Sequence, residues 1–485
     1  MERLTLLENN KYSKNANRFL LLALLSLLAA VFFGTVASFQ FMFPRFFELL
    51  PFIKSRPLHV SLVVAWIFLA AIAGIYFYLP KILKLPLYSL KLANLHFWLF
   101  LSTGILIIGS YLAGKFGGRE YWEFPPVLAI PIIISWVIFG FNFFKTISRK
   151  KNNWPVYKWM WATGIIFFLL TYLEANLWIF PYFHTNVIRE ITMQWKSYGA
   201  LVGSWNMLVY GTGIFVMGQI SGNQETAYSK TAFFMYFLGL TNLMFGWAHH
   251  IYPVPAASWI RHSAYAISMT ELLIFAWIIY NWKKSLSESK KHLHNLSYSF
   301  LFASDIWIYI NLCLALLISI PAINLFTHGT HITVAHAMGS TIGINTMILF
   351  SSVFLMIKTQ WPEKLKLKEK LIKKGFYISN ISLLVFFLAL TGAGAIKGFY
   401  TLQNELSFQE IMGKASPLLL VFAIAGLGLM IGIFMIVIPA IIPVYQSFFT
   451  IEKMKHQTKP ALQAKVLQKS LEVRRAGQAK VPMEN

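Results

Sequence analysis

Long apolar segments, each about the length needed to cross a lipid bilayer, recur along the whole chain. Twelve of them are long enough, at ~20 residues each, to form membrane-spanning helices. Apolar residues run continuously through these segments and do not alternate with polar ones, which predicts helices and not the strands of a membrane barrel. We place the spans near residues 19–43, 59–79, 92–113, 126–144, 157–180, 198–219, 231–248, 263–282, 303–324, 333–357, 375–397 and 416–446. The pattern therefore predicts an all-α, polytopic membrane protein.

The composition supports this prediction and limits the chemistry. Of the 485 residues, 57% are hydrophobic and only 12% are charged, which is more apolar surface than a soluble domain can bury. The single cysteine, Cys313, excludes structural disulfides, a covalently attached haem of the Cys-x-x-Cys-His type, a two-cysteine copper centre and a cysteine-ligated iron–sulfur cluster. Any haem is therefore expected to be non-covalent, with His or Met as its axial ligands.

The net charge of +24 would suggest nucleic-acid binding if the basic residues shared one surface. They gather instead before the first span, after the even-numbered spans and in the tail, whereas the segments after odd-numbered spans carry few. The positive-inside rule then predicts that both termini are cytoplasmic. We expect a cytoplasmic segment at 1–18, a membrane domain at 19–446 and, at 447–485, a basic cytoplasmic tail that touches anionic lipid and no nucleic acid.

Several unusual polar residues fall on the outward side of this predicted topology. They are His59 and Tyr198 at the starts of spans two and six, His249 and His250 at the end of span seven, and His336 and Met338 at the start of span ten. Polar residues in a bilayer are costly and commonly functional, and imidazole is the commonest metal ligand. The residue types favour two haems around span ten and a third metal at the histidine pair.

These segments resemble the catalytic subunit of bacterial, cytochrome-c-dependent nitric-oxide reductase, a member of the haem–copper oxidase superfamily. The resemblance covers essentially all twelve spans and is carried by SRPLHVSLVVAW, GREYWEFPP, GWAHHIYPVP and FTHGTHITVAH. It implies a twelve-helix haem–copper oxidase bundle in a bacterial inner membrane, with its metal site toward the periplasm. It also implies that His59 binds a low-spin b-type haem, that His336 binds a high-spin b-type haem, and that His249 and His250 bind non-haem iron or copper.

The resemblance implies further sites and an activity. Glu120 and Glu123 of the GREYWEFPP segment correspond to residues that bind a calcium ion bridging to haem propionates. Glu271 follows His250 at the spacing of the family's eighth-helix glutamate, which serves proton delivery or the electrostatics of the site. The implied reaction is the reduction of two NO to N2O and water. Electrons would come from a membrane-anchored cytochrome c subunit, because this chain has no cytochrome c motif, or alternatively from a quinol.

Two departures from the family pattern alter these expectations. The tenth helix reads His336-Ala-Met338 where the family has a second histidine, so Met338 becomes the predicted low-spin ligand and raises the haem potential relative to two histidines. On the sixth helix, Tyr198, Val202 and Asn206 stand where the family has a histidine and two glutamates. Tyr198 is then either a tyrosinate ligand or a donor of a proton or hydrogen atom. Tyr198 could instead be an ordinary tyrosine of the membrane interface, and Met338 an ordinary residue of the apolar core.

Three other functions stay open at this point. They are an NO dismutase or O2 reductase of the same superfamily, a haem protein with a degenerate second metal site, and a transporter of another class. Glu174, a second carboxyl inside a span, is expected in a proton path or beside a polar partner. His328 and His331 are expected to contact haem propionates or water, and no role is predicted for His96 or His184.

Overall fold

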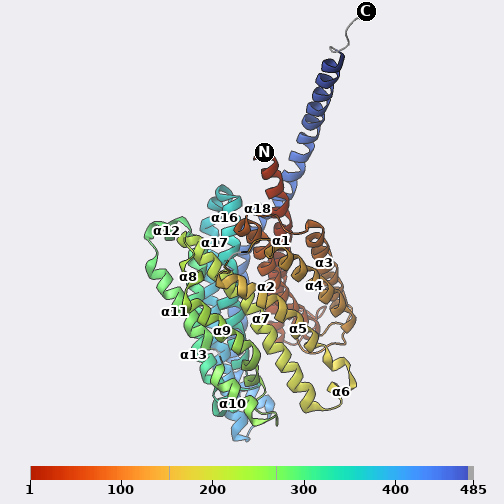
Figure 1. Cartoon of the computed structure of the whole chain (residues 1–485). Coiled ribbons are helices and arrows are strands. Elements are labelled where there is room, and N and C mark those ends of the chain that lie inside the picture. Colours follow the sequence, from red (N-terminus) through yellow and green to blue (C-terminus); the bar gives the residue numbers. More distant parts are fainter. Residues whose placement is uncertain (1, 152, 269, 479–485) are drawn as a thin grey trace, which may run out of the picture.

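The computed structural model describes residues 2–151, 153–268 and 270–478, with side chains described from 13 to 448 inside those ranges. This part of the chain forms a bundle with twelve helices long and apolar enough to cross a membrane (Figure 1). Within the described ranges the only strand-like pairing is an isolated bridge between Arg119 and Trp122. The predicted all-α, twelve-span architecture is therefore confirmed.

The spans are built from eighteen α-helices and four short 3-10 or π segments, not all of which cross the bundle. The spanning helices are α1 (Glu2–Met42), α2 (Phe52–Leu83), α3 (Leu90–Leu112), α4 (Ala129–Ile147), α5 (Val156–Ala175), α7 (Val187–Ser221), α9 (Lys230–Phe245), α10 (Ser258–Ile267) with α11 (Thr270–Ser285), α13 (Asn295–Ser319), α15 (His331–Met338) with α16 (Met347–Gln360), α17 (Pro362–Gln403) and α18 (Phe408–Gln478). The π-helix η4 (Gly339–Thr346) lies inside the tenth span, between α15 and α16. The other short elements, at the ends of spans or between them, are η1 (Pro126–Leu128), η2 (Leu177–Ile179), α6 (Pro181–His184), α8 (Glu225–Tyr228), η3 (Gly246–His250), α12 (Glu288–Leu293) and α14 (Pro321–Thr327).

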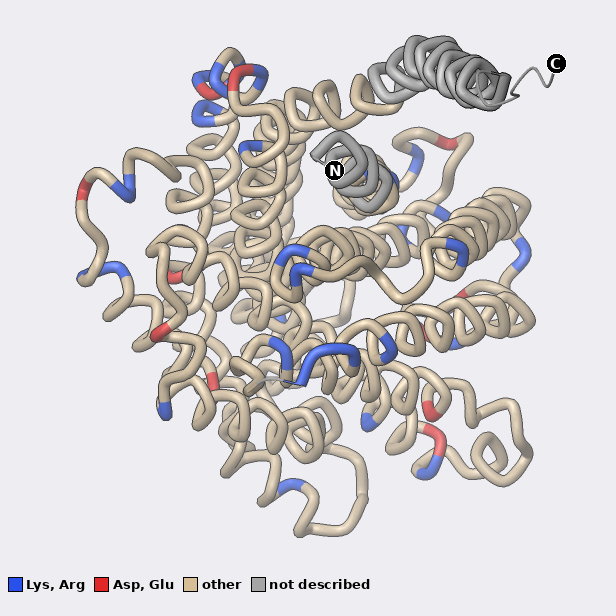
Figure 2. Tube along the Cα trace, turned by 45° about the horizontal axis from the view of Figure 1, so that its top comes forward, with Lys and Arg blue, Asp and Glu red and all other residues tan. Residues whose placement is uncertain are grey.

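Helix α1 begins and helix α18 ends at the same end of the bundle (Figure 1). We call the opposite end, which is formed by the connections 43–51, 113–125, 176–186, 251–257, 320–330 and 404–407, the far end. Lys, Arg, Asp and Glu gather in the connections and leave most of the helix length uncharged (Figure 2). This distribution is what a bilayer requires, because charged side chains are costly at its centre. Which side of a membrane the far end faces stays a prediction.

Local sequence signals explain where many helices begin and end. Asn186 caps α7 by accepting a hydrogen bond from the Arg189 N–H, and Ser89 caps α3 in the same way. Both residue types are preferred at such caps because their side chains satisfy an otherwise unpaired backbone donor. Helix α7 ends at Gly222, whose φ of 72° lies in the left-handed region that glycine adopts without strain.

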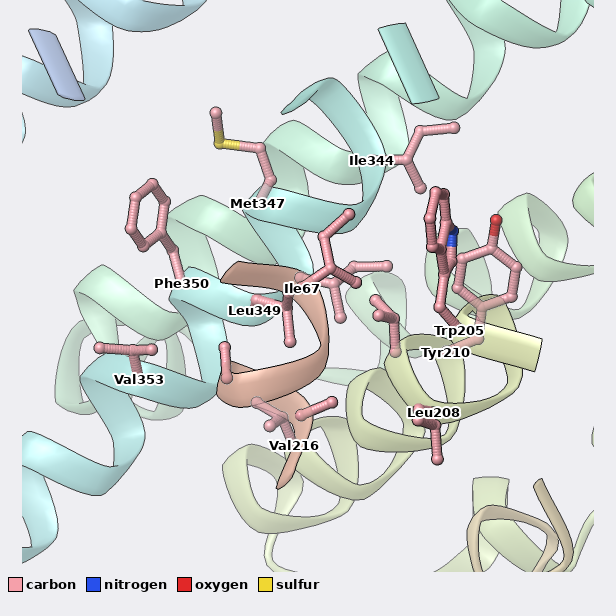
Figure 3. Close-up of a cluster of buried hydrophobic side chains, with 14 of the residues drawn as sticks. Ile67, Trp205, Leu208, Tyr210, Val216, Ile344, Met347, Leu349, Phe350 and Val353 are labelled. Carbon is pink, nitrogen blue, oxygen red and sulfur yellow. The ribbon is translucent and has the colours of Figure 1, made fainter. Parts of the chain in front are cut away.

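The centre of the bundle is a dense apolar contact between α2, α7 and α16. Figure 3 shows Ile67 of α2 among side chains of the other two helices, including Val216 of α7 and Phe350 of α16, and all three are buried. Glycine allows close approach nearby, because a Cβ at Gly164 would lie 2.8 Å from the Ser204 carbonyl oxygen. Packing of this kind holds membrane helices together where lipid offers no hydrophobic driving force.

The tenth span is not a uniform helix, which the hydropathy pattern did not reveal. Helix α15 ends at Met338, the π-helix η4 covers Gly339–Thr346, and α16 continues from Met347. π-Helical segments are rare and occur frequently at functional sites. This one directly follows the predicted haem ligands His336 and Met338.

Candidate metal centre

The histidine pair lies on the 3-10 segment η3, at the far end of the seventh span. The rings of His249 and His250 are 4.1 Å apart between centroids. Asn324 of α14 donates to the His249 carbonyl oxygen at 3.1 Å and so fixes the backbone of the pair. The segment begins at Gly246, where a Cβ would lie only 1.8 Å from the Asn242 side-chain oxygen. The close approach of Asn242 therefore requires glycine at this position.

Three of the predicted ligand histidines each have a hydrogen-bond partner at Nδ1. The Nδ1 atom of His59 lies 2.8 Å from the Ala30 carbonyl oxygen, and that of His249 lies 2.6 Å from the Gly246 carbonyl oxygen. The Nδ1 atom of His336 lies 3.3 Å from the Asn311 carboxamide. No partner for their Nε2 atoms occurs among the described residues. Metal-binding histidines commonly use one ring nitrogen for the metal and the other for a backbone carbonyl or polar side chain. At His59 and His249, whose Nδ1 atoms face carbonyl oxygens, this arrangement fits haem or metal ligation through Nε2. At His336 the facing group is the carboxamide nitrogen, so ligation there needs a different orientation of Asn311.

The histidines of η3 and α15 converge at the far end. His250 lies close enough to His336 and to His249 for their charges to interact, and His336 is likewise coupled to His249. His249 and His336 are each 7% exposed. Chain segments some eighty residues apart therefore bring three imidazoles near one another, and their role as metal and haem ligands stays a prediction.

The other predicted haem ligands lie at the same end but are not joined to this cluster by any contact among the described side chains. His59 faces α1, where a Cβ at Gly34 would lie 2.6 Å from its Nδ1 atom. Met338 is partly buried and packs against the main hydrophobic core. Pairing of His59 with Met338 around one haem stays a prediction.

Tyr198 lies farther inside its helix than the hydropathy pattern predicted. Helix α7 begins at Val187, 198 − 187 = 11 residues earlier, so Tyr198 is about three turns from the helix start. Its ring packs edge-on against Tyr121, with centroids 5.5 Å apart, and against Trp195. Trp195 in turn stacks on His250 at 5.0 Å and 12°. Tyr198 is therefore separated from the histidine pair by one indole ring, and its buried hydroxyl has no partner among the described residues.

The second metal would receive few protein ligands. No group of three or more His, Cys, Asp or Glu side chains placed to hold a metal ion occurs in the described part of the chain. The two imidazoles of η3 fit a metal that has a preference for nitrogen ligands, such as iron or copper. Its remaining ligands would have to be water, substrate or a tyrosine.

A small cavity of about 10 Å³, room for about one water molecule, lies farther along α7 and has Glu271, Asn206 and Asn242 in its wall. Glu271, which is 4% exposed, accepts a hydrogen bond from Asn242 at 2.8 Å through Oε1, and its Oε2 has no partner among the described residues. Asn206, on the cavity wall, accepts from Asn345 at 3.2 Å. Buried polar cavities with unpaired oxygens commonly hold water. The predicted site residues Glu271 and Asn206 are thus brought together.

A tightly folded loop, residues 113–125, covers the far end. A Cβ at Gly118 would lie 1.7 Å from the Trp122 carbonyl oxygen, so the loop requires glycine there. Arg119 lies 4.0 Å above the Trp178 ring and donates to Glu190 at 2.6 Å. These contacts attach the loop to η2 and to the start of α7.

The loop carboxylates predicted as calcium ligands bind an arginine instead. Arg56 of α2 donates to Glu120 at 2.7 Å and to Glu123 at 2.8 Å. Burial raises the pKa of the Glu123 carboxyl above its ordinary value, and Arg56 partly opposes that rise. A guanidinium presents several donors in a fixed plane and is suited to bridge two carboxylates. In this arrangement Arg56 supplies a positive charge beside Oε1 of both glutamates, which argues against a calcium ion there, while Oε2 of Glu123 has no partner among the described residues.

A larger and mostly apolar cavity, of about 170 Å³, lies between α2, α3 and α4. Its walls include Leu58, Leu62, Phe100, Ile108, Trp136 and Phe168. The hydroxyl groups of Ser61 and Tyr111, which are 3.0 Å apart, lie on its wall. Ser61 follows His59 by two residues on α2, so the cavity adjoins the predicted low-spin haem ligand.

The remaining polar residues have more ordinary environments. Glu174 forms an ion pair with Lys196, which agrees with one of its two predicted roles. The fully buried His96 bonds to the Tyr76 hydroxyl at 3.0 Å, and His184 bonds to the Trp178 carbonyl oxygen. His331 lies against Phe41, and the predicted propionate contacts of His328 and His331 stay predictions.

Sequence reasoning did not identify Arg56, Trp195, Asn311 or Ser268 as parts of the site. Ser268 lies 3.2 Å from the His249 Nδ1 atom and accepts a hydrogen bond from Ser319. The sequence contains only a weak signal for these residues. Single Ser and Asn residues in apolar spans occur often, and only the fold shows which of them contact a ligand histidine.

A membrane bundle of this topology, with histidines of several helices gathered near one end, defines a membrane redox protein that binds metal cofactors. The chain belongs to the family described as cytochrome c and quinol oxidase polypeptide I, whose profile matches residues 14–428. It is therefore a member of the haem–copper oxidase superfamily, as predicted, and the transporter alternative is excluded. The family implies haems and a second metal site.

Known relatives are distant in sequence but similar over most of their length. The chain is 23% identical over 447 residues to a nitric oxide reductase subunit of Stutzerimonas stutzeri, covering 86% of this chain and 92% of that protein. It is 22% identical over 365 residues to the cbb3-type cytochrome c oxidase subunit CcoN1 of the same organism, covering 71% and 74%. A solved haem–copper terminal oxidase dimer has the same fold, with a TM-score of 0.71, 15% identity and coverage of 90% and 84%.

The Arg56 bridge predicts a protein that needs no calcium. We expect the purified wild-type chain to contain no stoichiometric calcium and to keep its haem absorption spectrum after treatment with a chelator. Arg56→Gln leaves Glu120 and Glu123 without their cation, so this variant should gain calcium binding, measured as bound calcium after dialysis. Arg45→Gln, at a far-end arginine outside the bridge, is the control. One calcium ion per wild-type chain, with loss of the haem spectrum on its removal, would contradict the prediction.

Proposed function

We propose that this membrane oxidoreductase reduces nitric oxide, converting two NO, two electrons and two protons into N2O and water. The observation that carries the proposal is the nearness of His336 to His249 and His250 at the far end, with His249 and His336 buried and His250 partly buried. Similarity to a nitric oxide reductase subunit over 92% of its length supports it. Two metals that face each other across a substrate-sized gap are suited to bind and polarise two small molecules.

The chain's own residues divide the work as follows. His59 and Met338 would hold the low-spin haem, His336 the high-spin haem, and the pair in η3 iron or copper. When bound, these groups supply the redox chemistry and Lewis acidity. The backbone and side-chain partners of the Nδ1 atoms orient the imidazoles toward the shared region.

The small cavity beside α7 contains a carboxyl group, Glu271, that can supply protons. Asn242 holds Oε1 of Glu271, which leaves Oε2 without a protein partner. A carboxyl in this position can bind a proton at Oε2 and release it to water in the cavity. Asn206 and Asn345 extend the polar wall toward the π-helix η4. We therefore assign proton delivery to Glu271, with Asn206 as a hydrogen-bonding residue and not a carboxylate.

We assign Tyr198 the role of a proton donor rather than of a permanent metal ligand. Its ring meets Trp195, which separates it from His250, and its hydroxyl is buried without an acceptor among the described residues. A phenol can donate to an oxygen that gains negative charge as NO is reduced.

The experiment that tests the function combines metal analysis with product analysis. We expect two haems and one further iron or copper per purified chain, and release of N2O from NO with a chemical reductant. Release of O2 from NO would identify a dismutase, and O2 consumption without NO turnover would identify an oxygen reductase. Two haems without the extra metal and without turnover would instead support a degenerate haem protein.

The donor role predicts a selective effect of Tyr198→Phe. Removing the hydroxyl should lower the NO-reduction rate by about 100-fold, the lower end of typical general-acid contributions, with unchanged haem and metal content. Tyr172→Phe is the matched control, because Tyr172 is also a buried tyrosine whose hydroxyl has no partner among the described residues. Equal rates in wild type and Tyr198→Phe would remove the residue from the mechanism.

We propose a membrane-anchored cytochrome c subunit as the electron donor, and the apolar cavity beside α2 favours an isoprenoid quinol as the second candidate. The cavity combines an apolar wall for a hydrocarbon tail with the Ser61 and Tyr111 hydroxyls for a quinol head group. Apolar cavities with a few convergent polar groups are common places for small molecules to bind. Its wall is formed partly by the turn of α2 that follows His59.

Substitutions at two glycines of α3 distinguish a quinol donor from a cytochrome c donor. A Cβ at Gly104, on the cavity wall, meets no atom within 4 Å, and neither does one at Gly109, which is not part of that wall. With a quinol donor, Gly104→Leu should slow haem reduction by a short-chain quinol at least tenfold, whereas Gly109→Leu should not. Wild-type protein that is reduced by a cytochrome c but not by the quinol would exclude the quinol. Both outcomes are read from haem absorption in stopped flow.

A further inference from the structure

Asn311 of α13, a residue buried to 0% exposure, contacts the predicted proximal ligand twice. In the orientation that satisfies its hydrogen bonds, the carboxamide nitrogen donates to the His336 carbonyl oxygen at 3.1 Å and to the His336 Nδ1 atom at 3.3 Å. The carboxamide oxygen then accepts from the Ser340 N–H at 3.3 Å. One side chain thus holds both the imidazole and the backbone around it.

The two backbone groups that Asn311 binds are separated by four residues. An uninterrupted α-helix would join the His336 carbonyl oxygen to the Ser340 N–H. Here α15 gives way to the π-helix η4 at Gly339, where the regular pattern changes. A Cβ at Gly339 would lie 2.6 Å from the carboxamide atom of Asn311 that is the nitrogen in this orientation, so the absence of a side chain at Gly339 gives the carboxamide room to reach this position.

Binding of iron by His336 changes what the carboxamide must do. A hydrogen bond donated to Nδ1 requires that Nδ1 carry no proton, which places the proton of a neutral imidazole on Nε2. An imidazole that binds iron through Nε2 carries its proton on Nδ1 and needs an acceptor there. The carboxamide can accept that proton only if its oxygen and nitrogen exchange places, which gives up its two favourable backbone contacts.

We propose that Asn311 is the positioning residue of the proximal ligand, and that its carboxamide turns over when iron binds so that its oxygen accepts the His336 Nδ1–H. This inference rests on the proposed function, which makes His336 the ligand of the high-spin haem. As a neutral acceptor, the carboxamide fixes the ring and leaves His336 a neutral imidazole. A carboxylate there would draw the proton away and make the ligand a stronger electron donor.

The proposal also connects the two haem ligands of the tenth span. Met338 lies between His336 and Ser340, inside the segment whose backbone Asn311 holds. Rotation of the carboxamide upon iron binding therefore loosens the backbone beside the predicted low-spin ligand. Because both groups depend on one side chain, changes at Asn311 should be detected at both haems.

The test compares Asn311→Asp with Asn311→Leu, using the iron–histidine stretching frequency of the ferrous high-spin haem in resonance Raman spectra. Asp should raise this frequency and lower the haem potential, by at least the 59 mV that corresponds to a tenfold change in a one-electron equilibrium constant. Leu removes the acceptor and should lower the frequency. Asn380→Asp is the control, because Asn380 accepts from Trp307 and not from His336.

A merely structural role would give a different result. Both variants would then lose haem or shift in the same direction, and frequencies equal to wild type in haem-replete protein would overturn the proposal. Failure of the proposed function is detected separately, because His336→Ala would then retain a high-spin haem with an unchanged iron–histidine band. Neither the comparison of the Asn311 variants nor that of His336→Ala uses the rate of NO reduction as its measurement.

Discussion

The arrangement of the far end depends on one constraint: an imidazole inside an apolar bundle must have a hydrogen-bond partner, since an unpaired polar group there is costly. His59, His249 and His336 meet it through Nδ1, and each partner comes from the local backbone or an adjacent helix. Satisfying one ring nitrogen leaves the other available and also fixes the ring plane. Glycines stand where the partners approach, since a Cβ at Gly34 or Gly339 would collide with His59 or with Asn311. Ligand geometry therefore follows from the satisfaction of buried polar groups.

Charged side chains at the far end also have partners, because arginines form ion pairs with the glutamates there. Arg56 joins the 113–125 loop to α2 one turn before His59, and Arg119 joins the same loop to α7 through Glu190. The loop therefore ties the helix that carries the predicted low-spin ligand to the helix that carries Tyr198. Two carboxylates and one guanidinium leave a single negative charge, which does not require a divalent cation. The link is protein-built, and so it exists independently of any haem propionate.

The fold was predictable from the sequence because hydropathy depends on residue type alone: all twelve expected spans are present. The family resemblance was confirmed, since it rested on segments around His59, His249 and His336. Features that depend on backbone geometry were not predictable. The π-helix after Met338 leaves no mark on hydropathy, and the polar start of α7 concealed how far Tyr198 lies inside its helix. Contacts such as that of Asn311 with His336 join residues that are distant in the chain, so no local pattern records them.

The altered sixth helix has an electrostatic consequence for the proposed second metal. The nearest arrangement of protein ligands is two neutral imidazoles, and the carboxyl of Glu271 lies in the separate polar cavity beside Asn242. A dication held only by neutral ligands in a low-dielectric region is poorly compensated, which favours a lower metal charge or recruitment of an anion. Glu174 cannot supply that charge, because Lys196 already neutralises it. Reduced copper needs less compensation than ferric iron, and the phenol of Tyr198, one indole ring from His250, is a nearby group that can become anionic. The presence of Val202 and Asn206 at the positions of the family's two glutamates therefore changes the charge of the site and not only its set of ligands.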